Sequence, residues 1–276
     1  MYNLLKKLCS IHAPSGNESA IQTFLLDYIQ QNKAAWKTQP QIFFGDDFQN
    51  CIILVFGKPR VACFAHIDNI GFTVRYGNEL VKIGGPKLVS GFILTGEDKE
   101  GLIECTLQVD DDQLLSYNFH RKIDPGTDLS FKMNFREDNE YVQSCYMDNR
   151  LGVLNALKQC ETIENGAIIF SCWEEHGGGS VPFIAKFLYE KYQIKQALIS
   201  DITWRTEGVH HSNGVVVSLR DSGIPRRVFV NRVMQCLEKN NISFQKEIEA
   251  AEEVMAMNYK SNLILLTGVL WVLPKI

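Results

Sequence analysis

Helical and strand-like patterns alternate near both ends of this 276-residue chain, and a long stretch between them breaks the alternation. Apolar residues recur at helical spacing from Ile21 to Ile29, and two strand-like runs follow at Cys51–Phe56 and Val61–Ala65. After residue 145 the pattern predicts helices at Arg150–Cys160, Ser180–Tyr192 and Arg226–Glu238, and strands at Ala167–Trp173, Ala197–Ile202 and Gly214–Leu219. Strands that alternate with helices are typical of an α/β fold with a mixed sheet flanked by helices.

The stretch from residue 72 to residue 142 has a different character. Glycine and acidic turn residues separate short strand-like runs in it, and no helical periodicity is evident. We therefore expect a small inserted β-rich domain at residues 72–142, within an α/β domain formed by residues 1–71 and 143–276. Residues Ser15 to Glu18 also match a capping box, which predicts that a helix begins there.

Charge and composition narrow the possible partners. Lys plus Arg number 28 and Asp plus Glu number 32, a formal net charge of −4, so no basic surface for nucleic acid or an anionic membrane is expected. The most apolar segment, Leu263–Leu273, is too short to cross a bilayer, which needs about 20 residues. Eight cysteines occur without a CxxC pair, and the N-terminus does not resemble a secretory signal, so we expect reduced cysteines and a cytoplasmic protein.

Four clusters of polar residues follow predicted strands or begin predicted helices. The first, His66-Ile67-Asp68, comes directly after the buried run Val61–Ala65. Alternation places His66 and Asp68 on one side, where the carboxylate either orients the imidazole of a metal ligand or only satisfies it at a strand end. The second cluster contains Asp148, which precedes a helix and is either a chemical group or an ordinary N-cap.

The third cluster contains the adjacent residues Glu174 and Glu175, which follow an apolar strand. Two neighbouring carboxylates at a buried strand end need a positive charge nearby, which a divalent cation would provide, unless the turn is solvated. In a metal site, one of the two can bind the ion while the other acts as general base.

The fourth cluster is Asp201, again after a run of strand formers, and the loop that follows contains His210 and His211. We interpret this histidine pair as surface or substrate-lining rather than metal-binding. An HxD pair, an aspartate, a Glu-Glu pair and a second aspartate suit zinc, cobalt or manganese, and a bridging aspartate can hold two ions about 3.5–4 Å apart. The pattern therefore predicts a two-metal hydrolase, and no GxSxG, Walker A or HExxH motif occurs.

Taken together, these segments resemble the tetrahedral (TET-type) metallo-aminopeptidases, the group that includes glutamyl and deblocking aminopeptidases. The resemblance is carried by residues 13–18, 65–72, 147–152, 174–177 and 200–201, and so runs through most of the chain. The long gap between His66 and Asp148 is filled by the β-rich insertion, as in this family. The resemblance implies a zinc exopeptidase-like fold, a peptide substrate and homo-oligomers that assemble through the inserted domain.

The resemblance also implies a ligand set. His66 and Asp201 would bind one metal, Asp148 would bridge both, and Glu175 would bind the second. The cofactors would be two divalent metal ions, zinc first, with cobalt or manganese as alternatives.

The remaining roles follow from the same resemblance. Glu174 would be the general base and Asp68 would hold the His66 ring. The peptide bond between Asp148 and Asn149 would be cis. The reaction would be hydrolysis of the first peptide bond of a peptide.

One departure from the family pattern concerns the end of the chain. The family places a final histidine ligand of the second metal in its last third, whereas no histidine follows His211 in this sequence, and residues 252–276 do not look like a terminal strand and helix. Codons for residues 252–259, read from the last base of the Glu252 codon, can encode Gly-Ser-Asp-Gly-Asn-Glu-Leu-Gln, similar to a family segment. We therefore hypothesise a frameshift near Glu252 and an impaired second metal position, which sequencing the gene in both frames would test.

Two other functions are compatible with the same residues. One is a catalytically silent homologue that binds peptides or oligomerises. The other is a deacylase of N-acyl amino acids, which uses similar ligands with different substrate loops. Metal stoichiometry separates the first from an enzyme, and substrate choice separates the second from an aminopeptidase.

Overall fold

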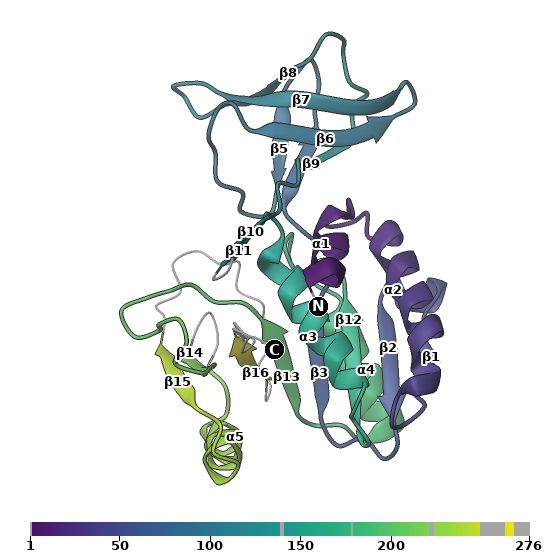
Figure 1. Cartoon of the computed structure of the whole chain (residues 1–276). Coiled ribbons are helices and arrows are strands. Elements are labelled where there is room, and N and C mark those ends of the chain that lie inside the picture. Colours follow the sequence, from purple (N-terminus) through teal and green to yellow (C-terminus); the bar gives the residue numbers. More distant parts are fainter. Residues whose placement is uncertain (1, 139–140, 178, 221–223, 249–262, 268–276) are drawn as a thin grey trace.

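The computed structural model describes residues 2–138, 141–177, 179–220, 224–248 and 263–267, and consists of an α/β part and a smaller β part (Figure 1). The α/β part has a six-stranded mixed sheet in the order β1-β2-β12-β3-β13-β16. The bounds of its strands are β1 Gln41–Phe43, β2 Ile52–Phe56, β3 Ala62–His66, β12 Gly166–Ser171, β13 Ala197–Asp201 and β16 Leu263–Thr267. The expected mixed α/β fold with an inserted β region is confirmed.

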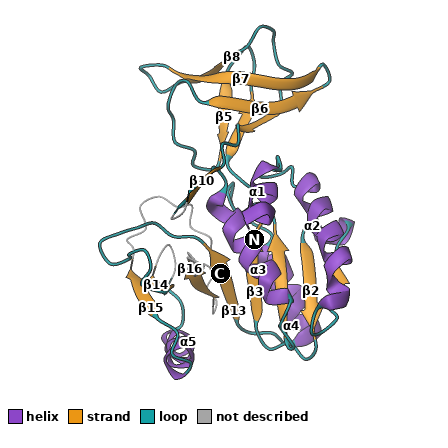
Figure 2. Ribbon diagram, viewed as in Figure 1, coloured by secondary structure: helices purple, strands orange, loops and turns teal. Residues whose placement is uncertain are grey.

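Helices flank this sheet (Figure 2). Their bounds are α1 Tyr2–Ser10, α2 Ser19–Asn32, α3 Met147–Cys160, α4 Val181–Tyr192 and α5 Arg227–Lys239, with short 3-10 helices η1 Lys33–Ala35 and η2 Asp46–Phe48. The chain runs from β3 through the inserted region and α3 to β12, and then through α4 to β13 on the other side of β3. Because crossovers between parallel strands are right-handed, these opposite directions place α3 and α4 on opposite faces of the sheet. The apolar residues of β2, β3 and β12 are buried between them, in one continuous core.

Three neighbouring strands run parallel and end at one edge of the sheet. Strand β12 pairs with β3 so that Ser171 lies opposite His66, and β13 pairs with β3 on its other side with Ile199 opposite Phe64. The carboxyl ends of β3, β12 and β13 therefore meet, and this edge is where open α/β sheets place their sites.

The inserted region forms a second six-stranded sheet, antiparallel, in the order β5-β4-β9-β6-β7-β8. Its strands are β4 Gly71–Val74, β5 Leu80–Ile83, β6 Ile93–Asp98, β7 Gly101–Val109, β8 Leu115–Asn118 and β9 Asp128–Phe131. It has a hydrophobic core of its own, built around Phe72, Leu94 and Leu129. We call residues 71–131 the inserted module; the expected boundaries at 72 and 142 remain a prediction.

Two short sheets complete the described structure. Strands β10 Arg136–Glu137 and β11 Val142–Gln143 pair where the chain returns from the inserted module, and β14 Val215–Arg220 pairs in parallel with β15 Phe244–Ile248. The strand expected at Gly214–Leu219 is confirmed as β14, and it lies outside the main sheet. Its hydrogen-bonded partner is β15, and α5 connects the two strands and packs on β14 through Phe229 and Val230.

The prediction that Ser15 to Glu18 form a capping box is wrong. Helix α2 begins at Ser19 with Glu18 in the cap position, and no side chain caps its free N–H groups. The carboxylate of Glu18 is turned inward and accepts a hydrogen bond from the backbone N–H of Gly16 at 2.8 Å. The residue types of a capping box are thus present, but buried contacts made by Glu18 replace the cap.

The C-terminal segment is described only in part. Residues 249–262 and 268–276 lie outside the described residues, and so does nearly all of the tail that the frameshift hypothesis concerns. The expectation of no terminal strand is wrong for Leu263–Thr267, which pair in parallel with β13 as β16. Five consecutive strand formers of this kind are long enough for an edge strand.

Within the described residues, no helix has the length and apolar character needed to span a membrane. All eight cysteines are free thiols. Six of them are buried, and these six serve as small apolar core residues.

Candidate metal centre

His66 is the last residue of β3, and its ring lies at the centre of a group of carboxylates. The side chain is 3% exposed, its Nε2 lies 3.0 Å from Asp148 Oδ1, and its Nδ1 lies 3.4 Å from Asp68 Oδ1. Burial alone lowers the pKa of this imidazole, but Asp148, Asp201 and Asp68 outweigh burial and hold the pKa well above its ordinary value. The ring is thus surrounded by negative charge on both nitrogen sides.

Asp148 is presented by the irregular start of α3. Tyr146 before it is in the left-handed region with φ 65°, and Asp148 and Asn149 have non-helical backbone angles joined by a cis peptide bond. The Asn149 side chain donates to Ser200 O at 2.9 Å and accepts from Gly152 N at 3.0 Å. Of the two roles considered for Asp148, the N-cap role does not hold, because the cap position belongs to Tyr146 and the Asp148 carboxylate faces His66.

Gly152 allows α3 to approach β13 closely. A Cβ at this position would lie 2.3 Å from Ser200 O and 2.1 Å from Asn149 Oδ1, so only glycine fits. The close contact brings Asp148 next to Asp201, the last residue of β13. Asp201 Oδ2 lies 3.8 Å from His66 Nε2, and burial raises the pKa of Asp201 well above its ordinary value.

The turn after β12 supplies the two glutamates. Glu174 Oε2 lies 3.9 Å from His66 Nε2, and burial raises the pKa of its carboxyl. The backbone N–H of Glu175 donates to Asp68 Oδ2 at 2.9 Å. Burial, followed by repulsion from Asp148 and Glu174, raises the pKa of Glu175 to about 8.

The structure thus brings together the six residues to which the resemblance gave a role in the site: His66, Asp68, Asp148, Glu174, Glu175 and Asp201. Atoms of His66, Asp148 and Asp201 lie within 4.8 Å of one another, close enough to hold one ion, whereas Glu175 lies outside this group of three. The pair His210-His211 is not brought to the centre. The backbone of His210 instead bonds to Gln245, at the exposed end of the β14–β15 sheet.

The donor set suits a divalent cation. Five carboxylates and an imidazole crowd together, and within the described part of the chain no lysine or arginine forms an ion pair with those carboxylates. His66 Nδ1 and Asp68 Oδ1 are buried and form no hydrogen bond that meets ordinary geometric limits. Like charges this close to one another, with Asp68 buried and Asp201 mostly so, favour a cation between them, and one imidazole with carboxylate oxygens is the ligand chemistry of zinc, manganese or cobalt.

Two supporting residues were not anticipated from the sequence. Arg150 is fully buried and donates to the backbone oxygen of Ile67, between His66 and Asp68, and to Asn69 Oδ1 at 2.9 Å. Gly84 of the inserted module donates its backbone N–H to His176 Nδ1 at 3.2 Å, beside Glu175. Arg150 lies within the segment 147–152 that carries the resemblance, whereas nothing in the local sequence of Gly84 signals its contact.

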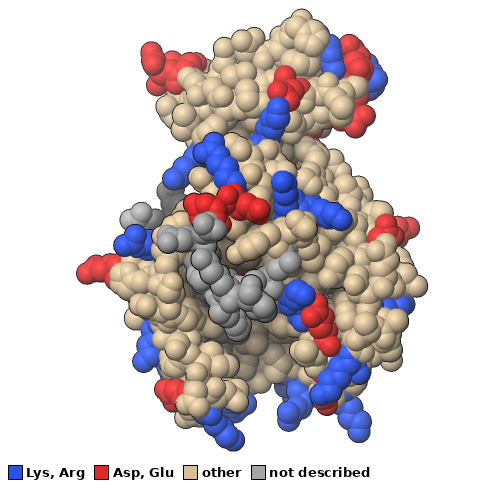
Figure 3. Space-filling view, in the orientation of Figure 1, with Lys and Arg blue, Asp and Glu red and all other residues tan. Residues whose placement is uncertain are grey.

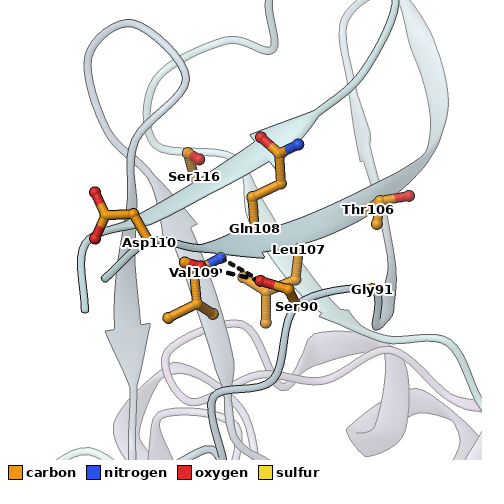
Figure 4. Close-up of a pocket in the computed structure, with 8 residues that line it drawn as sticks. All are labelled: Ser90, Gly91, Thr106, Leu107, Gln108, Val109, Asp110 and Ser116. Atoms are coloured by element: carbon orange, nitrogen blue, oxygen red, sulfur yellow. Dashed lines mark hydrogen bonds between the residues drawn. The ribbon is translucent and has the colours of Figure 1, made fainter. Parts of the chain in front are cut away.

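Outside the carboxylate cluster, one face of the surface and one hollow of the inserted module show no second gathering of charge. Lysine, arginine and acidic side chains are interspersed on the face shown in Figure 3, without a broad basic patch. A hollow in the inserted module is lined by Ser90, Gln108 and Asp110 among others (Figure 4), and none of its lining residues belongs to the carboxylate cluster. There Ser90 Oγ donates to Val109 O and accepts from Val109 N, which attaches the loop to β7.

The ends of the parallel strands thus bring a histidine and carboxylates together into the arrangement of a divalent-metal centre, in an α/β domain interrupted by a β module. A family model described as M42 glutamyl aminopeptidase matches residues 110–260, more than half of the chain. The chain belongs to the M42 glutamyl aminopeptidase family, a family of metal-dependent hydrolases, and is therefore an aminopeptidase-type hydrolase. Comparison with curated proteins finds no match.

Solved structures share the fold at low sequence identity. The TET1 peptidase of Pyrococcus horikoshii has a TM-score of 0.76 at 20% identity, over 96% of this chain and 90% of that one. An aminopeptidase of Desulfurococcus kamchatkensis has a TM-score of 0.77 at 18% identity, over 96% and 85%. A TET aminopeptidase of the marine sediment archaeon Thaumarchaeota archaeon SCGC AB-539-E09 has a TM-score of 0.78 at 14% identity, over 96% and 87%.

Proposed function

We propose that this protein is a two-metal aminopeptidase that hydrolyses the N-terminal peptide bond of peptides. The observation that carries the proposal is the position of His66 Nε2, which lies 3.0, 3.8 and 3.9 Å from carboxylate oxygens of Asp148, Asp201 and Glu174. Membership of the M42 family supports the peptide substrate.

The residues divide into two ligand groups. His66, Asp148 and Asp201 would hold the first ion, and Asp148 with Glu175 would hold the second. Zinc is the proposed metal, with cobalt and manganese as alternatives, because histidine and carboxylates serve all three. When bound, such ions supply Lewis acidity that lowers the pKa of a water molecule and polarises a peptide carbonyl.

Glu174 would act as the general base. Its side chain is 39% exposed, so it faces both the ligand cluster and the solvent from which a water and a peptide arrive. From this position its carboxylate would take a proton from the attacking water. The same carboxyl would then deliver the proton to the leaving amine.

The second ion would bind more weakly than the first. Among the described residues it has two carboxylates, Asp148 and Glu175, and no imidazole, whereas the first has three ligands including His66. Fewer ligands mean lower affinity, so activity would depend on the metal concentration supplied. The proposed impairment of this chain is therefore a loss of hydrolytic activity at metal concentrations too low to fill the second position.

Titration with zinc and hydrolysis assays test the proposal together. We expect two binding steps of different affinity by isothermal titration calorimetry, and hydrolysis of amino-acid anilides at saturating zinc. Glu174→Gln should lower kcat about 100-fold or more while both ions still bind. Glu190→Gln on the exposed face of α4 is the matched control and should change neither measurement.

The outcomes separate the alternatives. Hydrolysis of N-acyl amino acids but not of amino-acid anilides would contradict the aminopeptidase proposal and favour a deacylase. Fewer than two bound ions at saturating zinc, with no hydrolysis of either substrate, would favour a silent peptide-binding or oligomerising homologue.

We also propose that the chain forms homo-oligomers through the inserted module. The TET1 peptidase of Pyrococcus horikoshii, which shares the fold, is described as assembling into a tetrahedron or a large octahedral shell. The module exposes apolar side chains, including Leu102 at 83% and Leu114 at 66%, which is consistent with an assembly surface. Peptides are the proposed partners, with no role in binding nucleic acid or membranes, in a cytoplasmic location.

A further inference from the structure

Glu18 is a buried carboxylate that the proposed reaction does not use. Its side chain is 1% exposed. Oε1 accepts hydrogen bonds from Gly16 N at 2.8 Å and from Trp173 N at 3.3 Å, whereas Oε2 is buried and without a partner. Burial of a glutamate side chain is unfavourable unless its hydrogen bonds compensate for the lost contact with water.

One of those contacts holds an unusual piece of backbone. Trp173 lies in the left-handed region with φ 62°, although it carries a large side chain, and it directly precedes Glu174. Residues other than glycine adopt this conformation only where their surroundings hold them there. The turn containing Gly16 also lies close to the indole ring, because a Cβ at Gly16 would be 3.8 Å from Trp173 Nε1.

The same turn is attached to the other side of the site. The N–H of Ser15 donates to Asn69 O at 3.2 Å, and the N–H of Asn69 donates to Ala13 O at 3.0 Å. Asn69 directly follows Asp68, which accepts the N–H of Glu175. The turn at residues 13–18 therefore contacts the segment after β3 and the segment after β12 simultaneously.

We propose that Glu18 is a positioning residue, whose Oε1 holds the Trp173 N–H and thereby sets the direction in which the Glu174 side chain enters the metal centre. This inference rests on the proposed role of Glu174 as general base. Among the described residues, the Glu18 side chain bonds to Gly16 and Trp173 and not to a proposed ligand, so its effect is transmitted through the backbone of Trp173.

The proposed role needs an acceptor oxygen and not a negative charge. Burial raises the pKa of Glu18 to about 7, so a neutral side chain is compatible with this pocket near neutral pH. Glutamine has the same shape and retains one acceptor oxygen, which can take both N–H bonds. Alanine removes the acceptor and leaves the N–H groups of Gly16 and Trp173 without this partner.

The test compares Glu18→Ala and Glu18→Gln with a control that also disturbs the core. Ile21→Ala removes a fully buried side chain from α2 but no hydrogen bond to the Trp173 N–H, so it reports the effect of lost stability. Hydrogen exchange of the Trp173 amide, resolved by mass spectrometry of fragments, needs no metal or substrate. The second measurement is kcat and KM for an amino-acid anilide in the zinc-saturated protein.

We expect Glu18→Ala to speed exchange of the Trp173 amide at least about 10-fold and to lower kcat about 10- to 100-fold with KM nearly unchanged. Glu18→Gln should stay close to the parent protein in both measurements, and Ile21→Ala should change neither. The inference is overturned if Glu18→Ala leaves Trp173 exchange or kcat as in the parent, or if Glu18→Gln loses as much as Glu18→Ala. Absence of hydrolysis by the parent protein would instead overturn the proposed function, and Trp173 exchange in the two Glu18 variants would still decide whether Glu18 holds this backbone.

Discussion

Asp68 shows how a single side chain can organise the centre without binding a metal. Its Oδ1 lies 3.4 Å from His66 Nδ1, and its Oδ2 accepts the backbone N–H of Glu175 at 2.9 Å. One carboxylate thus connects a ligand of the first proposed ion with a ligand of the second. Partners of this kind orient the histidine ring and select the nitrogen that faces the metal.

Substitution of Asp68 by asparagine should weaken metal binding. The amide keeps the shape but has one acceptor atom in place of two, so either His66 or the Glu175 N–H loses its partner. We expect zinc affinity to fall about 10- to 100-fold, measured by isothermal titration calorimetry.

A matched control for Asp68→Asn lies in the inserted module. Asp128 accepts a hydrogen bond from Thr73 Oγ1 at 3.1 Å and bonds to none of the proposed ligands, so Asp128→Asn should leave zinc affinity unchanged. Equal affinities for Asp68→Asn and the parent protein would show that Asp68 does not orient the site.

Among the elements, the turn after β5 makes the contact that joins the inserted module to the metal centre. Gly84 has φ +71°, and a Cβ built on it would lie 2.9 Å from Glu175 O and 3.2 Å from Glu175 Oε2. Gly84→Ala should therefore displace Glu175 and weaken the second ion about 10-fold while the first ion binds normally. The measurement is the second step of a zinc titration.

The neighbouring glycine provides the control for Gly84→Ala. A Cβ on Gly85 would meet nothing within 4 Å, so Gly85→Ala should bind both ions as the parent does. A second zinc step that is the same in both variants would mean that the turn does not constrain Glu175.

The loop after β8 is fastened to the end of β6 by an ion pair. Arg121 donates to Asp98 through Nη1 at 2.7 Å and through Nη2 at 2.8 Å. This guanidinium holds the pKa of Asp98 well below its usual value. A depressed pKa in the folded state contributes stability above the unfolded pKa, about 4, and the contribution is lost as the pH falls through the folded value.

Acid should therefore destabilise the inserted module partly through Asp98. In urea unfolding followed by circular dichroism, the midpoint should fall between pH 6 and pH 3 in the parent protein. Asp98→Asn should reduce that fall, because the variant has no carboxylate to protonate. An identical pH dependence in both proteins would show that this ion pair does not contribute.

For the whole molecule, the inserted module has a hydrophobic core separate from that of the α/β part, yet still exposes large apolar side chains. If these side chains form the proposed assembly surface, Leu102→Glu should reduce the mass measured by light scattering after size exclusion. A buried charge at an interface is unfavourable without a partner. Ile242→Glu, on an exposed apolar residue outside the module, should leave the mass unchanged, and assembly unaffected by Leu102→Glu would contradict this surface.

Much of this architecture was predictable because the signals are local. The apolar run before His66 indicated a buried strand, and the glycine and acidic turns after it indicated a β-rich insertion. The prediction that polar residues at strand ends lie together followed from the shared edge of parallel strands, and the pairing of Ser171 with His66 has this geometry. The capping box misled because its glutamate found partners elsewhere in the fold.

The sequence alone determined which elements form and which residues are available for chemistry, since hydrophobic periodicity and strand-end positions are read over a few neighbouring residues. The tertiary structure alone decided which atoms meet: Glu18 reaches Trp173 across 155 residues, and Gly84 reaches His176 across 92. Such contacts depend on the packing of helices and on the position of the inserted module, and spacing along the chain carries no signal for either.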